Sequence, residues 1–247
     1  MLVHGYLGGA AQWAGQVAAF SARTEVLTPE LPGFGGRSAE TAPDTIGAFA
    51  GTVLDALDAR GVDRFALLGH SMGGMVAQEI VARVPARVER LVLYATGAVG
   101  AMPGRFATFA ASRRRIALEG TRATARRIAA TWFLDGERAP GYDACAAIAE
   151  LASADAMRAG LDAMERWSRA GDLARVRCPT LVLWGEADWS YAWPVTERLW
   201  RSIPDASLAV VPGCAHAVHL ERPALFDALV GDFLARAPRP GAPGAPT

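Results

Sequence analysis

The sequence contains no lysine and no asparagine, so arginine supplies all 25 of its basic side chains. The missing lysine excludes a P-loop nucleotide site, a Schiff-base enzyme and a Ser-Lys dyad. The missing asparagine excludes an N-glycosylation site. These absences remove several chemistries before any motif is considered.

An excess of charge is also lacking, because 25 acidic side chains balance the 25 basic ones. The chain therefore has no net positive field to attract nucleic acid, and we expect no nucleic-acid partner. No window of about eighteen apolar residues is present, and the first residues do not follow the pattern of a signal peptide. We expect a soluble, cytoplasmic protein that does not bind a membrane.

Cysteine is scarce. Cys145, Cys178 and Cys214 are an odd set without the paired spacing of a metal site. In a chain of this size such a set favours reduced thiols over a disulfide framework.

What the chain does contain is apolar sequence: 51% of its 247 residues are hydrophobic, enough for a large core. Helical spacing of apolar residues occurs over residues 45–58 and 74–84, between short apolar runs typical of buried strands. The expected strands are residues 2–3, 25–27, 65–68, 91–94, 180–184 and 208–211. This alternation predicts an α/β fold with a doubly wound, mostly parallel sheet.

Residues 97–168 interrupt the alternation, since they contain no strand run and are rich in alanine and arginine. We interpret them as a helical insertion that lies over the carboxyl edge of the sheet, where it would act as a lid. The sheet domain would then comprise residues 1–96 and 169–237. Residues 238–247 alternate proline, glycine and alanine, which predicts a disordered tail.

A candidate nucleophile lies in residues 69–73, Gly-His-Ser-Met-Gly, between an expected strand and an expected helix. This is the G-x-S-x-G pattern, in which small residues permit a tight turn that exposes the serine above the sheet. Ser71 is therefore the predicted nucleophile. The alternative is a glycine-rich turn with an incidental serine.

A serine nucleophile requires a histidine base, and the chain has four histidines. His216 and His219 follow the last expected strand, and we predict that His216, in the loop, is the base. His219 would pack behind it. Cys214, His216 and His219 could alternatively bind a metal, but a further ligand at a suitable spacing is missing, and we expect no metal.

The histidine in turn requires a carboxylate, and Glu186 and Asp188 both follow the strand expected at residues 180–184. We predict Asp188, which gives the chain order Ser, Asp, His that is typical of one hydrolase fold. The alternative role for Asp188 is a turn or a cap before a helix over residues 191–203.

An oxyanion intermediate requires backbone donors. We predict the N–H of Met72, next to the serine, and the N–H of Tyr6 in residues 4–9, His-Gly-Tyr-Leu-Gly-Gly.

With these motifs in this order, the chain closely resembles the α/β-hydrolase superfamily, particularly its lidded esterase, enol-lactonase and carbon–carbon bond hydrolase branch. The resemblance covers roughly residues 2–236. It includes residues 30–38, where Glu30 stands in the usual place of an aspartate. The glycines of this loop hint at a dinucleotide site, but Ser38 occupies the position of the third glycine, and we interpret the loop as a structural turn without a cofactor.

One departure from the resemblance concerns the sheet. Relatives normally carry two strands before the His-Gly loop, whereas this chain begins within the strand that leads to it. We expect a sheet edge that is left uncovered and is available for self-association into a homo-oligomer.

The predicted activity is that of a serine hydrolase that cleaves a small ester, thioester or lactone through an acyl-enzyme on Ser71. The resemblance leaves open enol-lactone hydrolysis, carbon–carbon bond cleavage, and transfer to an alcohol or to peroxide. A different class is also open: a catalytically silent binding protein that keeps the fold.

The substrate pocket is expected to include Trp132, Phe133, Trp189 and His219. The arginines of the insertion could bind a substrate carboxylate, but a chain without lysine needs arginine on every solvated helix face, and we favour a surface role. These are Arg105, Arg113, Arg114, Arg115, Arg122, Arg126 and Arg127.

Overall fold

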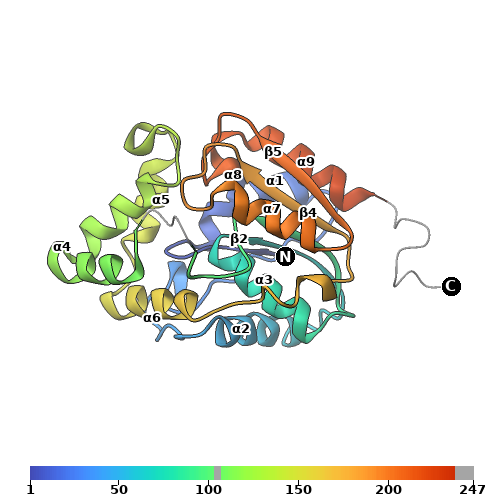
Figure 1. The fold of residues 1–247 in the computed structure, drawn as a ribbon, viewed down its shortest axis with the longest axis horizontal. Helices are drawn as coiled ribbons and strands as arrows, with labels where there is room; N and C mark the ends of the chain where they lie inside the picture. Colours follow the sequence, from blue (N-terminus) through green and yellow to red (C-terminus); the bar gives the residue numbers. More distant parts are fainter. Residues whose placement is uncertain (103–106, 237–247) are drawn as a thin grey trace.

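Five parallel strands, hydrogen-bonded in chain order, form the sheet of the computed structural model (Figure 1). They are β1 (Leu2–Val3), β2 (Phe65–His70), β3 (Val88–Tyr94), β4 (Thr180–Gly185) and β5 (Ala206–Val211). The structure describes residues 1–102 and 107–236. The tail predicted for residues 238–247 and the side chain of Arg105 therefore lie outside the described residues.

Strands β1 to β4 are largely buried on both faces, and their side chains alternate between two apolar clusters, whereas most of β5 is only half-buried. Leu91 and Leu93 of β3 belong to one cluster, whereas Val92 and Tyr94 belong to the other. This two-sided burial explains why the strands appear in the sequence as continuous apolar runs.

Helices cover both faces of the sheet (Figure 1). On one face, α2 (Ile46–Asp58) and α3 (Met72–Arg83) pack together, and the apolar cluster that they share extends to α7 (Trp193–Ser202). On the other face lie α1 (Ala14–Phe20) and α9 (Pro223–Ala235). Short helical turns connect these elements: η1 (Ala10–Trp13), η2 (Gly35–Arg37), η4 (Leu173–Arg175) and α8 (Val218–Glu221).

One predicted strand is absent from the structure, and the bounds of several other predicted elements shift by one to three residues. The strand expected at residues 25–27 is wrong: this segment is irregular and joins the sheet through the bond from Leu2 N–H to the carbonyl of Leu27, 2.8 Å. Its first residue, Glu25, is exposed, and this one backbone bond does not make the repeated pairing of a strand ladder. The helix expected from residue 74 begins at Met72, directly after Ser71.

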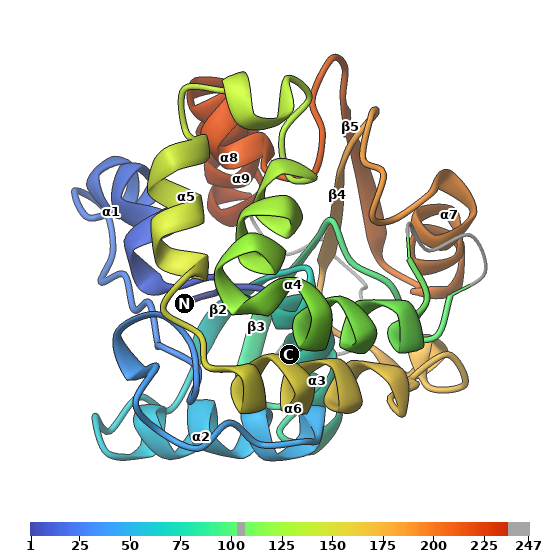
Figure 2. The same ribbon diagram turned by 90° about the vertical axis from the view of Figure 1, so that its left-hand side faces the viewer.

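The residues between β3 and β4 form inserted helices: α4 (Phe109–Ala130), η3 (Gly136–Arg138), α5 (Tyr142–Ala149) and α6 (Ala154–Glu165). The backbone of α4 breaks at Gly120, where φ is +79°. Both α5 and α6 pack against α4, and Figure 2 shows the three helices in front of the sheet. The two ends of the insertion meet in an antiparallel bridge between Val99 and Ser168.

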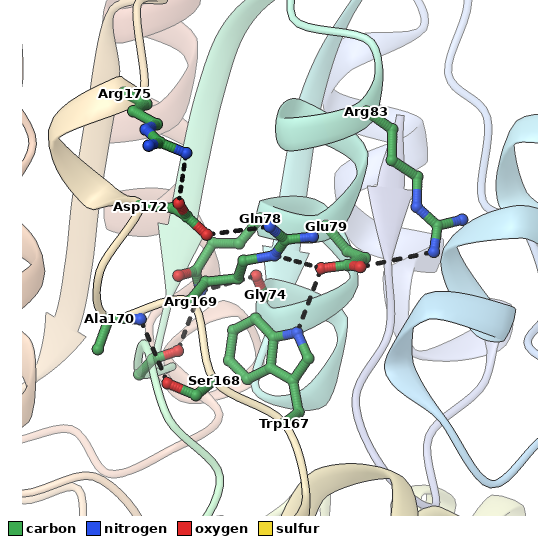
Figure 3. Close-up of polar contacts among 11 residues, drawn as sticks. Gly74, Gln78, Glu79, Arg83, Trp167, Ser168, Arg169, Ala170, Asp172 and Arg175 are labelled. Carbon is green, nitrogen blue, oxygen red and sulfur yellow. Dashed lines mark hydrogen bonds and ion pairs between the residues drawn. The ribbon is translucent and has the colours of Figure 1, made fainter.

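The returning end of the insertion is fastened to α3 by the carboxylate of Glu79 (Figure 3). This carboxylate accepts hydrogen bonds from Trp167 Nε1 at 3.4 Å and Arg169 Nε at 2.6 Å, and it also contacts Arg83 at 3.5 Å. The helix that follows Ser71 therefore also anchors the base of the insertion.

No helix in the described ranges combines the length and the apolar character needed to cross a bilayer.

Candidate active site

Ser71 lies at a sharp turn between β2 and α3, with a backbone φ of +56° and ψ of −120°. A Cβ atom on Gly69 would lie 2.2 Å from the carbonyl oxygen of Gly73, and one on Gly73 would lie 2.4 Å from that of Val3. The turn therefore requires glycine at both positions. A positive φ at serine is strained, and such strain persists only where the surrounding structure fixes it.

His216 and Asp188 form a buried pair, in which His216 Nδ1 lies 2.9 Å from Asp188 Oδ2. An ionised carboxylate only accepts hydrogen bonds, so the imidazole proton is assigned to Nδ1. The lone pair of the ring then lies on Nε2, which is the atom that a general base uses.

The second oxygen of Asp188 accepts two backbone bonds, from Ser190 N–H at 2.7 Å and Tyr191 N–H at 3.3 Å. The two roles considered for Asp188, a turn and a partner of histidine, therefore coexist, with one oxygen serving each. The alternative acid, Glu186, is exposed and accepts a bond from Gly213 N–H at 3.3 Å.

Ser71 and His216 line the same cavity, which has a volume of about 480 Å³ including its opening to solvent. The insertion and the loop after β4 supply most of the other walls. The remaining lining residues are Tyr6, Met102, Ile128, Thr131, Trp132, Met164, Ser190 and Tyr191. No arginine, aspartate or glutamate lines the cavity within the described residues.

The four residues expected in the pocket have different positions. Trp132 lines the cavity, whereas Phe133 is buried beside it and outside its lining. Trp189 is 71% exposed and His219 is buried behind His216, so the structure brings neither of them into the lining.

The two segments expected to supply oxyanion donors both adjoin Ser71. A Cβ on Gly5 would lie 2.9 Å from Ser71 Cβ, so the loop that carries Tyr6 passes directly against the serine. The Tyr6 hydroxyl donates to the carbonyl of Met157 at 2.9 Å, which anchors this loop to α6. Met72 is the first residue of α3, where a backbone N–H has no acceptor within the helix.

Sequence reasoning missed two residues that hold the backbone of His216. The carbonyl oxygen of His216 accepts hydrogen bonds from Tyr94 Oη at 2.9 Å and from His70 Nε2 at 3.0 Å. Burial, and then the proximity of His216, lower the pKa of His70 well below its usual value, so this ring is a neutral donor. His70 lies within the serine motif, but no signal in the sequence indicated what it contacts.

His219 belongs to the same buried group. Its ring packs against Trp13 at 4.5 Å, and its Nδ1 lies 3.1 Å from the Tyr94 hydroxyl. Burial lowers the pKa of His219 to about 3. In the described part of the chain, no three His, Cys, Asp or Glu side chains are grouped so that they could hold a metal ion.

Several arginines of the insertion pair with acidic side chains of the insertion itself. The pairs are Arg113–Asp162 (2.5 Å), Arg122–Glu150 (3.2 Å), Arg126–Glu150 (3.0 Å) and Arg127–Glu119 (2.9 Å). These contacts agree with the surface role that the sequence favoured for them.

Comparisons with known proteins identify the family of the chain. The chain is 36% identical over 227 residues to polyketide synthase ThaQ of Burkholderia thailandensis, a match that covers 87% of the chain but spans only 11% of that protein. It is 29% identical to RutD of Variovorax paradoxus, which carries a provisional assignment as a carbamate hydrolase, over 98% of the chain and 94% of RutD.

Among solved structures, the enol-lactonase of Burkholderia xenovorans LB400 superposes with a TM-score of 0.86 at 25% identity. That match covers 95% of this chain and 91% of the lactonase. The sequence model of the Alpha/beta hydrolase family matches residues 1–229. The parallel sheet, its helical layers and this match together show that the chain belongs to the alpha/beta hydrolase family.

Proposed function

We propose that the chain is a serine hydrolase that cleaves a small, uncharged ester, thioester or lactone through an acyl-enzyme on Ser71. The observation that carries the proposal is that a strained serine and a carboxylate-bound histidine line one cavity. Without the histidine pair, the serine would be only part of a strained turn. Without the serine, the pair of His216 and Asp188 would be only a buried polar contact.

In this mechanism Ser71 Oγ attacks the substrate carbonyl carbon while His216 Nε2 removes the hydroxyl proton. His216 then gives that proton to the departing alkoxide or thiolate, which leaves an acyl-serine. Water then attacks the carbonyl carbon of the acyl-serine while His216 Nε2 removes a proton from the water. His216 gives this proton to Ser71 Oγ as the carboxylic acid is released. Asp188 stabilises the imidazolium, and the N–H groups of Tyr6 and Met72 hold the oxyanion.

The lining of the cavity supports an uncharged substrate. A substrate carboxylate would need a guanidinium or a comparable donor, and the described lining offers only hydroxyl, aromatic, thioether and aliphatic groups beside His216. The inserted segment would act as the lid, because Ile128 of α4, Trp132 just after α4 and Met164 of α6 line the cavity together with Ser71.

The named relatives widen the panel of carbonyl substrates that is worth testing. An enol-lactonase and a provisional carbamate hydrolase both act at a carbonyl carbon bonded to oxygen, as the proposed acyl transfer does. Uncharged lactones and carbamates therefore belong beside simple esters in the assay.

The decisive experiment is covalent trapping with a fluorophosphonate followed by peptide mass spectrometry. We expect the label on Ser71, and we expect Ser71→Ala to abolish both the label and the hydrolysis of p-nitrophenyl esters. Ser190 is the matched control, because it is a second serine in the lining, and Ser190→Ala should keep the label. Ester hydrolysis that persists in Ser71→Ala would refute the mechanism.

The same p-nitrophenyl ester assay tests the alternative that the chain is a catalytically silent binding protein. Such a protein would show neither a burst nor steady-state release of p-nitrophenol from p-nitrophenyl acetate above the background.

A further inference from the structure

Glu221, at the end of α8, joins two segments that are distant in sequence. Its Oε1 accepts a hydrogen bond from Leu134 N–H at 2.7 Å, and its Oε2 accepts one from Ala215 N–H at 2.7 Å. Leu134 belongs to the insertion, and Ala215 directly precedes His216. One carboxylate therefore bridges the insertion and the loop of the proposed base.

A second bond joins the same two segments on the other side of His216. Ala217 N–H donates to the carbonyl of Trp132 at 2.8 Å, and Trp132 lines the cavity. The backbone on either side of His216 is thus tied to residues 132–134, directly or through Glu221.

We propose that Glu221 is a positioning residue that makes the cavity wall at Trp132 and the loop of His216 move as one unit. Its catalytic consequence rests on the proposed function. Ser71 lies after β2 and His216 lies after β5, so their alignment depends on how the histidine loop is held. A displacement of about 1 Å between reacting groups can cost about a hundredfold in rate.

The chemistry of the bridge requires a carboxylate. Two N–H groups face its two oxygens, and hydrogen bonds to an ionised acceptor are about twice as strong as neutral ones. Glutamine has the same size, but its amide would turn an NH₂ donor toward one of the two N–H groups. Glu221→Gln therefore breaks one arm of the bridge with little change in volume.

The test combines kinetics with amide hydrogen exchange in Glu221→Gln. We expect exchange to become faster both in residues 131–135 and in residues 213–218. For an ester substrate, kcat should fall about tenfold or more, because the base is misplaced. KM should change by less than about threefold, because the side chains that line the cavity are kept.

Glu186→Gln is the matched control. Glu186 also accepts a backbone bond in the loop after β5, from Gly213, but its side chain is exposed and, within the described residues, this bond does not join the loop to the insertion. Its exchange should change only around residue 213, and kcat should stay within about twofold, since exposed contacts of this kind contribute little.

A second measurement uses the unaltered protein. A fluorophosphonate bound at Ser71 and lying against Trp132 should slow exchange in both segments together. Exchange that changes in only one segment, in the variant or in the adduct, would overturn the coupling. If the unaltered protein hydrolyses no substrate of the panel, the proposed function fails, while exchange in Glu221→Gln still decides whether the bridge exists.

Discussion

The hydroxyl of Tyr94 donates a hydrogen bond to the carbonyl oxygen of His216 over 2.9 Å, so the end of β3 holds the backbone of the proposed base. His70 donates to the same oxygen and stacks on the Tyr94 ring with centroids 4.5 Å apart. The imidazole of His216 is thus fixed through its ring by Asp188 and through its backbone by the core. Each of these contacts can be tested separately.

Tyr94→Phe removes the hydroxyl and keeps the ring that packs on His70. The His216 carbonyl loses one of its two donors, and the N–H and Nδ1 of His219 lose their shared partner. We expect kcat to fall about tenfold through misplacement of the base. The free energy of unfolding should fall by about 1–3 kcal/mol, because buried polar groups are left unpaired. Ester kinetics and urea denaturation measure the two effects, and an unchanged kcat would contradict the positioning role.

Asp188→Asn tests which acid serves His216. The asparagine amide would present a donor or a neutral oxygen to Nδ1, which disturbs the tautomer that the base requires, and kcat should fall by about 10³ to 10⁴. Its KM should change little. Glu186 is the other acid of the same turn, and the Glu186→Gln variant should retain activity. A larger loss of kcat in Glu186→Gln than in Asp188→Asn would indicate that Glu186, and not Asp188, serves His216.

The parts of the site that could be predicted from the sequence are those that follow from short local sequence patterns. The sharp turn at Ser71 was predictable because such a turn demands glycines at fixed offsets, and Cβ atoms at residues 69 and 73 would collide with backbone atoms in the structure as the pattern requires. Asp188 and His216 were found because parallel strands place their carboxyl ends at one edge of the sheet. The structure joins these two residues by a hydrogen bond, as the choice of Asp188 as the partner of His216 predicted.

The parts that could not be predicted depend on contacts between distant residues. Tyr94 and His216 are 122 positions apart, and Leu134 and Glu221 are 87 positions apart, so no spacing links them. The prediction that Trp189 lines the pocket is not supported by the structure. Its neighbour Ser190 lines the cavity, but the indole of Trp189 is exposed to solvent. The position of an aromatic residue in the sequence next to the proposed triad carboxylate does not reveal the direction of its side chain.

The buried histidines predict that the protein loses stability in acid. Burial lowers the pKa of His219 to about 3 and that of His70 well below 6.5, the value expected in the unfolded chain. Between these values the unfolded chain binds more protons than the folded one, so the free energy of unfolding falls as the pH falls below 6.5. Each such histidine contributes up to about 1.4 kcal/mol per pH unit.

His219→Gln tests this prediction, because glutamine does not titrate. Urea denaturation at intervals between pH 6.5 and 4 should give a shallower decline in the unfolding free energy for the variant than for the unaltered protein. Equal slopes would show that His219 is protonated in the folded state across this range.

The contacts of Glu79 at the base of the insertion predict a separate contribution to the free energy of unfolding. The hydrogen bond from Arg169 and, more weakly, that from Trp167 lower the pKa of Glu79 below 4.5, against the effect of its burial. Glu79→Gln should lower the free energy of unfolding at pH 7 by about 1–3 kcal/mol, because Arg169 loses an ionised partner. Since the pKa is depressed in the folded state, this contribution is complete above pH 4.5 and is lost as the pH falls through the lower folded value.

The difference between the unaltered protein and Glu79→Gln should therefore shrink below pH 4.5, as measured by urea denaturation. Glu89→Gln is the control, because Glu89 pairs with Arg64 at 3.2 Å while both side chains are about half exposed. Such an exposed pair is worth about 0–1 kcal/mol. A loss in Glu79→Gln no larger than that in Glu89→Gln would mean that the insertion is held at its base by the bridge between Val99 and Ser168 and by apolar packing, without a contribution from the carboxylate.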